Sequence, residues 1–291
     1  MTCHFIIYNV GLGQCIGVLP YDQKEYSMMV DCGHDSDFHP IDDFGKYLPK
    51  TDGQPSKPSL RSLVLTNYDH DHFSGLPYLN GSAEIVSVLV PKNLSMEEIR
   101  NLKPVATEAL DALEYIRTNY TSRVVGYSPP FTRKVFSLEQ DALAQAGIPI
   151  ETNHLSQMVF VQYGETTFCI PGDLENRSWE LMLAKPDIQS WLKKTNILMA
   201  SHHGRENGYH KNIFLYCKPD CVILSDKSIV HGTQKDMAAL YASHVRGNGI
   251  TYNPVSGKAV SRKTLTTRND GHILVTAPRT GSPTFKAHVV R

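Results

Sequence analysis

The chain of 291 residues lacks several features that would place it in a specialised class. No apolar run approaches the roughly 18–20 residues that a membrane-spanning helix needs, so we expect no membrane insertion. The first residues, MTCHFIIYNVG, show no basic region and no small-residue cleavage site, which predicts no signal peptide and a cytoplasmic location. Lys and Arg (29) balance Asp and Glu (29), so long duplex DNA, which favours basic proteins, is a less favoured partner.

Cysteine pairs of the CxxC type are also absent among the six cysteines. Most of these residues lie in apolar segments such as TTFCIPG, and buried free thiols in a reducing compartment are the simplest interpretation. Cys217 and Cys221 flank KPD, but their spacing is poor for a zinc pair. The length suits one large domain or two small ones. Because no repeat or low-complexity linker occurs, we expect a single domain over residues 1–291.

Short apolar segments predict strands at both ends of the chain. Those of the first third are CHFIIYNV, CIGVLP, YSMMVDCG, RSLVLTN and AEIVSVLVP, and those of the second half are SQMVFVQYG, TTFCIPG, TNILMAS and CVILSD. RSLVLTN is apolar almost throughout, which is typical of a central strand buried on both faces. The segment TLTTRNDGHILVTAP predicts a hairpin with NDG at its turn.

Helical patterns occupy the middle of the chain and the gaps between later strands. Residues 95–121 predict a helix with a capping box at Ser95 and Glu98, a break at Pro104 and a second cap at Thr107. Shorter helices are predicted at 137–147, 175–184 and 233–249. The alternation of strands and helices predicts an α/β protein in which two sheets pack face to face with helices outside, a four-layer αββα sandwich.

Polar clusters stand where four of the predicted strands end. They are Asp31 in VDCG, residues 67–72 in NYDHDH, Asp173 in PGDLE, and the pair His202 and His203 in SHHG. A single Asp at a strand end is most often a turn residue, but loops at strand ends also converge on ligands. Four such ends carrying Asp or His therefore favour a common site.

The residue types in these clusters favour a divalent metal. Asp and His are common ligands of Zn²⁺ and Mn²⁺. Carboxylates that converge without a cation raise one another's pKa, and a divalent ion removes that penalty. Two ions about 3.5–4 Å apart can share a carboxylate and activate water for attack on a phosphoryl or carbonyl group.

The segment NYDHDH resembles the metal motif HxHxDH of the metallo-β-lactamase superfamily. Asp71 and His72 match its last two positions. Asp69 matches the HxDxDH variant of the ComEC-like branch, named after the hydrolase domain of a competence DNA-uptake protein. Asn67 stands where the family has His. Further segments resemble this branch in order along the chain: YNVGLGQC, MVDCG, NHLSQMVFVQYGETTFCIPGDLE, SHHGR, CKPDCVILSDKSIVHGT and TTRNDGHILV. Only residues 93–150 resemble a helical insertion.

The resemblance implies a role for each matching residue. Asp71, His72 and a bridging Asp173 would hold one metal ion with one of the adjacent histidines, His203 being favoured over His202. Asn67 and Asp69 would hold a second ion, with Asn153 or His154.

Other positions would act around the ions. Asp31 would orient ligands from behind them, and His202 would face the phosphate. His231 would lie at the rim, and Arg205 would contact a phosphate.

The same resemblance implies a metal-dependent hydrolase, a phosphodiesterase or nuclease with one or two Zn or Mn ions. A metal-bound hydroxide would attack, and Asp71 or a bridging water would handle the proton. Two alternatives stay open: a lactam, amide or ester hydrolase, and a degenerate binding module weakened by Asn67. A phosphodiester or nucleotide substrate is expected, and nothing in the residues indicates a partner protein.

Overall fold

Two large sheets form the centre of the protein. The computed structural model describes residues 1–53, 55–103, 107–121, 127–227 and 236–290. The first sheet has nine strands, in the order β14 (Val260–Arg262), β13 (Ile250–Asn253), β17 (Thr284–Ala287), β16 (Ile273–Pro278), β1 (Thr2–Ile7), β2 (Ile16–Pro20), β3 (Met28–Val30), β5 (Ser62–Val64) and β7 (Val88–Leu89). The second has six, in the order β15 (Thr264–Thr266), β12 (Cys221–Leu224), β11 (Ile197–Met199), β10 (Thr166–Ile170), β9 (Met158–Tyr163) and β8 (Thr132–Phe136).

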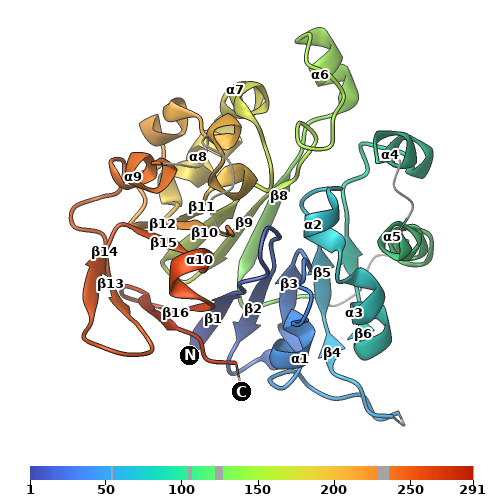
Figure 1. Cartoon of the computed structure of the whole chain (residues 1–291), viewed down its shortest axis with the longest axis horizontal. Coiled ribbons are helices and arrows are strands. Elements are labelled where there is room, and N and C mark those ends of the chain that lie inside the picture. Colours follow the sequence, from blue (N-terminus) through green and yellow to red (C-terminus); the bar gives the residue numbers. More distant parts are fainter. Residues whose placement is uncertain (54, 104–106, 122–126, 228–235, 291) are drawn as a thin grey trace.

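The helices lie outside the two sheets. On the side of the nine-stranded sheet Figure 1 shows α1 (Pro40–Phe44), α2 (His70–Phe73), α3 (Leu76–Ser82), α4 (Met96–Leu102) and α5 (Glu108–Asn119). On the side of the six-stranded sheet it shows α7 (Asn176–Leu183), α8 (Pro186–Lys194) and α9 (Met237–Ala242). The remaining elements are α6 (Gln140–Gln145), α10 (Thr267–Asp270) and the strand pair β4 (Ser59–Leu60) and β6 (Glu84–Ile85).

Alternating side chains of the strands fill the space between the sheets. Phe5 of β1 and Phe168 of β10 stack across it with ring centroids 4.0 Å apart. Their neighbours Ile6 and Cys169 face the opposite way and join the apolar cluster under the helices, because successive strand residues point to opposite faces. The two clusters and the helices outside them confirm the predicted four-layer αββα sandwich.

The predicted helix caps in residues 93–150 are confirmed, whereas the predicted break at Pro104 lies outside the described residues. Ser95 and Glu98 form both hydrogen bonds of the capping box, and Thr107 caps α5. This stretch is not purely helical, however, because Thr132–Phe136 form β8 and pair antiparallel with β9. Arg133 and Val135 are half-buried, so β8 is a partly exposed edge strand with a weak apolar signal.

The predicted hairpin at 264–278 is wrong. Thr264–Thr266 pair in parallel with β12 in the six-stranded sheet, whereas β16 belongs to the nine-stranded sheet. The intervening residues Thr267–Asp270 form α10, in which Thr266 accepts a hydrogen bond from the amide of Asn269. The segment thus crosses between sheets, and Gly271 (φ 67°) ends the helix.

Two expectations on composition are tested directly. All six cysteines are buried and unpaired. Within the described residues, no helix combines the length and the apolar character that crossing a membrane requires.

Candidate metal centre

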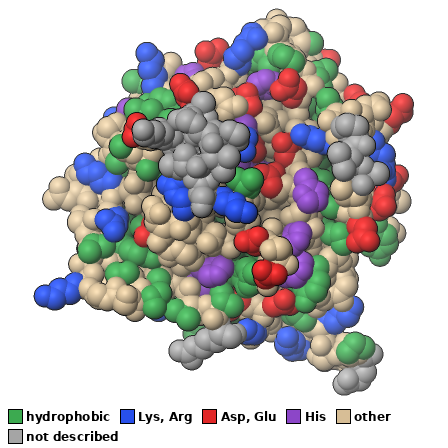
Figure 2. Space-filling view, viewed as in Figure 1, with side chains coloured by type: hydrophobic (Ala, Val, Ile, Leu, Met, Phe, Trp, Pro, Cys, Tyr) green, Lys and Arg blue, Asp and Glu red, His purple; other side chains and the backbone are tan. Residues whose placement is uncertain are grey.

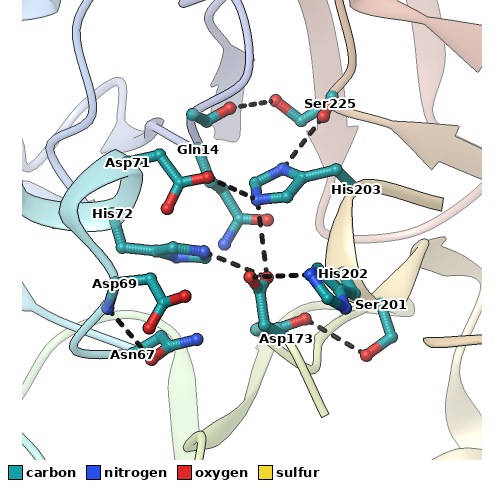
Figure 3. A network of polar contacts seen from close by, with 12 residues as sticks. Gln14, Asn67, Asp69, Asp71, His72, Asp173, Ser201, His202, His203 and Ser225 are labelled. Atoms are coloured by element: carbon teal, nitrogen blue, oxygen red, sulfur yellow. Dashed lines mark hydrogen bonds and ion pairs between the residues drawn. The ribbon is translucent and has the colours of Figure 1, made fainter. Parts of the chain in front are cut away.

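Five loops at the carboxyl ends of strands meet at one place between the two sheets. Asp31 follows β3, and the loop 65–69 with α2 follows β5. Asp173 follows β10, the short helix η2 (Ser201–Gly204) follows β11, and Ser225 follows β12. Figure 3 shows their side chains converging, and Figure 2 shows acidic and histidine side chains gathered over α2. The topology therefore brings together segments up to 200 residues apart.

Four of the predicted ligands form one compact cluster. Donor atoms of Asp71, His72, Asp173 and His203 all lie within 4.8 Å of one another. Nε2 of His72 is 3.0 Å from Oδ1 of Asp173. Nε2 of His203 is 3.2 Å from Oδ2 of Asp71 and 3.5 Å from Oδ1 of Asp173. Asp173 thus faces both imidazoles, and its predicted role as a bridge between two ions stays a prediction.

The two imidazoles are held by the nitrogen that faces away from the cluster. Nδ1 of His203 donates to the carbonyl oxygen of Ser225 at 3.0 Å, and Nδ1 of His72 lies 2.9 Å from Oδ2 of Asp31. Nε2 of both rings is buried and faces carboxylate oxygens of the cluster, with which the described residues form no well-aligned hydrogen bond. An imidazole that donates from Nδ1 presents its other nitrogen to a metal, which is the arrangement of metal-ligating histidines.

Asp31 is itself fixed by three donors. Its carboxylate accepts hydrogen bonds from Nε2 of Gln14 (2.7 Å), the amide of Thr66 (2.6 Å) and Oγ1 of Thr66 (2.7 Å). These contacts hold Asp31 against Nδ1 of His72, on the far side of the ring from Asp173, and its role in orienting a metal ligand stays a prediction. Sequence reasoning missed Gln14 and Thr66; Gln14 lies in the quoted motif YNVGLGQC, which was the signal available.

Backbone strain concentrates at the same place. Four non-glycine residues of the described chain have positive φ, and three of them are Asp31 (59°), His202 (50°) and His203 (55°). Such left-handed conformations cost free energy for residues with a Cβ and persist where surrounding contacts enforce them. The amide of His202 donates to the carbonyl of Gly172 at 3.1 Å, which ties η2 to the loop of Asp173.

Electrostatics couple the four clustered groups. Burial alone would lower the pKa of His203, but Asp173 and Asp71 raise it to about 10. Burial likewise opposes a charge on His72, yet Asp173 and Asp31 raise its pKa well above the usual range. Burial would raise the pKa of Asp173, but His72 and His203 hold it well below its ordinary value. Without a cation, imidazole protons thus balance the buried carboxylates.

His202 has a different environment from His203. Its Nε2 accepts a hydrogen bond from Arg205 at 3.1 Å and lies 3.9 Å from Oδ2 of Asp173. Burial lowers the pKa of His202, and Arg205 adds to that effect while Asp173 opposes it. Of the adjacent pair, His203 is therefore the one whose free nitrogen points between two carboxylates. Arg205 contacts His202, and a phosphate contact stays a prediction.

The structure does not bring the other predicted ligands into the cluster. Oδ1 of Asn67 accepts from the amides of Tyr68 and Asp69, and its Nδ2 donates to Oδ1 of Asn153 at 2.9 Å. His154 instead contacts Oγ of Ser178 at 2.9 Å.

His70 is exposed and lies outside the cluster. His231 lies outside the described residues.

Asp69 is also outside the cluster, because it has other partners. Its Oδ1 lies 2.7 Å from Nζ of Lys103 and accepts a hydrogen bond from Oγ1 of Thr152. The loop that resembles a six-residue metal motif therefore contributes only Asp71 and His72 to the cluster.

A cavity opens beside the cluster. Its volume is about 590 Å³, and it is lined by Leu12, Tyr68, Asp69, His70, Asp71, Phe73, Lys103, Thr107 and Leu110. Asp71 belongs to both the cluster and the cavity wall, so a molecule in the cavity would reach the cluster through this residue.

Comparison with known proteins gives structural matches only. No family model and no curated protein matches the chain. The metallo-beta-lactamase fold protein YhfI from Bacillus subtilis is 9% identical with a TM-score of 0.47, over 92% of this chain and 98% of that one. Zn²⁺-bound PqqB from Methylobacterium extorquens is 14% identical with a TM-score of 0.42, over 67% and 71%. CmlA, a diiron β-hydroxylase from Streptomyces venezuelae, is 13% identical with a TM-score of 0.45, over 84% and 51%.

Proposed function

We propose that this chain is a metal-dependent hydrolase of the metallo-β-lactamase superfamily that cleaves phosphodiesters. The observation that carries the proposal is the cluster of Asp71, His72, Asp173 and His203, with donor atoms within 4.8 Å of one another. The ComEC-like motifs of the sequence favour phosphodiesters over lactams as substrates. Residues around this cluster would also take part in the reaction.

The four clustered residues would hold one divalent ion, Zn²⁺ or Mn²⁺. Two carboxylates and two imidazoles are a suitable donor set, and the Nε2 atoms of His72 and His203 fit that use because they are buried and face the carboxylates of the cluster. When bound, such an ion supplies Lewis-acid polarisation of a substrate oxygen. Asp31 and the carbonyl of Ser225 would keep both rings in the coordinating orientation.

Asp71 is the residue best placed to receive a proton from attacking water. Its side chain is 31% exposed, against 0–3% for the other three clustered residues, and it lines the cavity. Burial would raise the pKa of Asp71, but His203 and His72 hold it below the ordinary value. The carboxylate is therefore ionised at neutral pH and accepts a hydrogen bond from water in the cavity.

His202 is suited to contact the phosphoryl group. Because Nε2 accepts from Arg205, the neutral ring carries its proton on Nδ1. Nδ1 is buried and lies 3.5 Å from Oε1 of Glu175, without a well-formed hydrogen bond to it. We propose that this N–H donates to a phosphoryl oxygen in place of the contact with Glu175 and that Arg205 adds positive charge behind it. We also propose that His231 lies at the rim of the site.

The cavity beside Asp71 favours a small substrate. Its volume of about 590 Å³ falls within the range of small-molecule sites, roughly 300–1,000 Å³. Leu12, Phe73 and Leu110 supply apolar walls, which suit a base or another apolar group attached to the phosphodiester. With a net charge of zero, the chain offers little attraction to long duplex DNA. A nucleotide-sized phosphodiester is the substrate class we propose.

Hydrolysis of bis(p-nitrophenyl) phosphate across a metal series tests the activity. We expect release of p-nitrophenol with Mn²⁺ or Zn²⁺, loss of that release in Asp173→Ala, and retention in the control Asp37→Ala, whose side chain is exposed. Turnover of nitrocefin without phosphodiester cleavage would favour a lactam hydrolase instead. Full activity in Asp173→Ala would overturn the assignment of the cluster.

We further propose that the chain works as a single domain in a reducing compartment such as the cytoplasm. The six unpaired, buried thiols support that compartment, since an oxidising one favours disulfides.

A further inference from the structure

Lys103 places a positive charge beside the candidate metal centre. It follows α4 in the stretch 93–150, and its side chain is 34% exposed. Nζ lies 2.7 Å from Oδ1 of Asp69, the residue that the resemblance assigned to a second metal ion. The same oxygen accepts a hydrogen bond from Oγ1 of Thr152. An ammonium group and a hydroxyl thus occupy one oxygen of the carboxylate that the resemblance assigns to a second cation.

The side-chain amide of Asn67 also has its hydrogen-bonding groups occupied. Its amide oxygen accepts from two backbone N–H groups, those of Tyr68 and Asp69, and its amide nitrogen donates to Asn153. Asn153 in turn donates from Nδ2 to Oε1 of Glu175 at 3.1 Å. An amide oxygen with both lone pairs used and an N–H donor are poor partners for a cation. The hydrogen bonds around Asn67 therefore stabilise the loop rather than a second metal site.

We infer that the chain holds one divalent ion, at Asp71, His72, Asp173 and His203, and that Lys103 supplies the second positive charge of the pocket. This inference rests on the proposed function and deepens it. Like charges repel, so a second ion at Asp69 would have to displace the ammonium group. The lysine comes from the stretch predicted as an insertion, which gives that stretch a role at the site.

The position of Lys103 also gives it a role toward substrate. Lys103 and Asp71 line the same cavity, so an anionic substrate that reaches the cluster passes the ammonium group. A lysine acts as a compact point charge on a flexible stem and can contact a phosphoryl oxygen while leaving the metal ligands untouched. Removing it should weaken substrate binding without changing the amount of metal held at the cluster.

Metal stoichiometry is the decisive measurement. The full chain is equilibrated with Mn²⁺ or Zn²⁺, freed of excess ion, and analysed by mass spectrometry for ions per chain. We expect one ion for the wild type and for Asn67→His, in which Lys103 still pairs with Asp69. We expect two ions for Asn67→His combined with Lys103→Met, which frees Asp69 beside a new imidazole. Lys92→Met, at an exposed lysine just before this stretch, should hold one ion.

The outcomes separate this inference from the proposed function. Two ions in the wild type would overturn the inference and leave the hydrolase intact. One ion without hydrolysis would refute the hydrolase and support the single-ion centre, and no bound ion would refute both.

Lys103→Met alone should also raise KM for bis(p-nitrophenyl) phosphate about tenfold, in line with loss of a charged hydrogen bond, while Lys103→Arg restores it. An unchanged KM in Lys103→Met would remove the role of this residue toward substrate.

Discussion

The carboxylate of Asp31 lies 2.9 Å from Nδ1 of His72, and both side chains are fully buried. Asp31 is also one of the few non-glycine residues with positive φ, so the backbone accepts strain to keep the carboxylate there. The contact leaves Nε2 of His72 directed at Asp173. Asp31 therefore acts through His72 rather than on a substrate.

Asp31→Asn tests that relationship. We expect metal affinity to fall by about 10–100-fold, because outer partners of ligating histidines fix the ring and its tautomer. Isothermal titration with Zn²⁺ or Mn²⁺ measures the change. Asp37→Asn, an exposed acid in the following loop, serves as the control and should bind metal as the wild type does. Equal affinities for the two variants would show that Asp31 does not position the ligand.

Substitutions of the two adjacent histidines, His202 and His203, should change different measured quantities. His203→Ala removes a nitrogen that faces Asp71 and Asp173, so its metal affinity should fall more than about 100-fold, beyond the loss of an outer partner. His202→Ala should keep one ion per chain and lower kcat by about 10²–10³, the usual effect of losing a hydrogen-bond donor to the charge that develops on the substrate. Metal content and kcat are measured on both variants. Loss of the ion in His202→Ala, with retention in His203→Ala, would reverse the two roles.

Gly13 and Gly33 stand where backbone segments beside the site pack too closely to leave room for a side chain. A Cβ on Gly33 would collide with the backbone carbonyl of Asp71, and so would one on Gly13. That carbonyl accepts a hydrogen bond from the amide of Gln14 at 3.2 Å. The glycines therefore let the loop of Asp71 pack directly against the turns that follow β1 and β3.

Gly33→Ala should consequently destabilise the fold and displace Asp71. Overpacking typically costs about 1–3 kcal/mol, and we expect a loss of this size in the free energy of unfolding, with weaker metal binding. Urea denaturation and metal titration measure the two effects. At Gly53 a Cβ meets nothing within 4 Å, so Gly53→Ala is the matched control and should leave both quantities unchanged. Stability equal to that of the control would mean that the loop tolerates the added methyl group.

The four layers and the convergence of the clustered residues could be predicted because both leave patterns in short segments of the sequence. Apolar segments predicted the strands, and polar residues at strand ends predicted that Asp71, Asp173 and His203 meet. Lys103 left no such signal. It pairs with a residue 34 positions earlier in the chain, and only the packing of α4 brings them together.

Two other differences from the sequence-based expectations have causes that the motifs themselves do not show. Asn67 reads as a ligand in the motif, but its oxygen is used by the amides that follow it, which depends on the turn geometry of the loop. The segment 264–278 has hairpin composition, yet β15 pairs with β12 of the other sheet. The free energy of that pairing comes from residues more than 40 positions away, so no local pattern contains it.

A final prediction concerns acid stability at a site far from the metal centre. Asp43 is buried, accepts a hydrogen bond from Oη of Tyr8 at 3.0 Å, and lies 2.6 Å from Nε2 of His288. Burial would raise the pKa of Asp43, but His288 and Tyr8 hold it below the ordinary value. A carboxyl with a lowered folded pKa contributes stability above its unfolded pKa of about 3.9, and this is lost as the pH falls through the folded pKa.

Asp43→Asn should therefore cost about 1–3 kcal/mol at neutral pH, the range for a hydrogen bond to a charged group. The difference from the wild type should hold down to about pH 5 and shrink below about pH 4, because the wild-type carboxyl is then protonated as well. Denaturant unfolding at several pH values measures it. Asp42→Asn is the neighbouring control, since Asp42 is exposed and accepts a hydrogen bond from Oη of Tyr78 at 2.9 Å. A difference that grows toward acid pH would mean that Asp43 is protonated in the folded protein, and the charged contact with His288 would then not stabilise the fold.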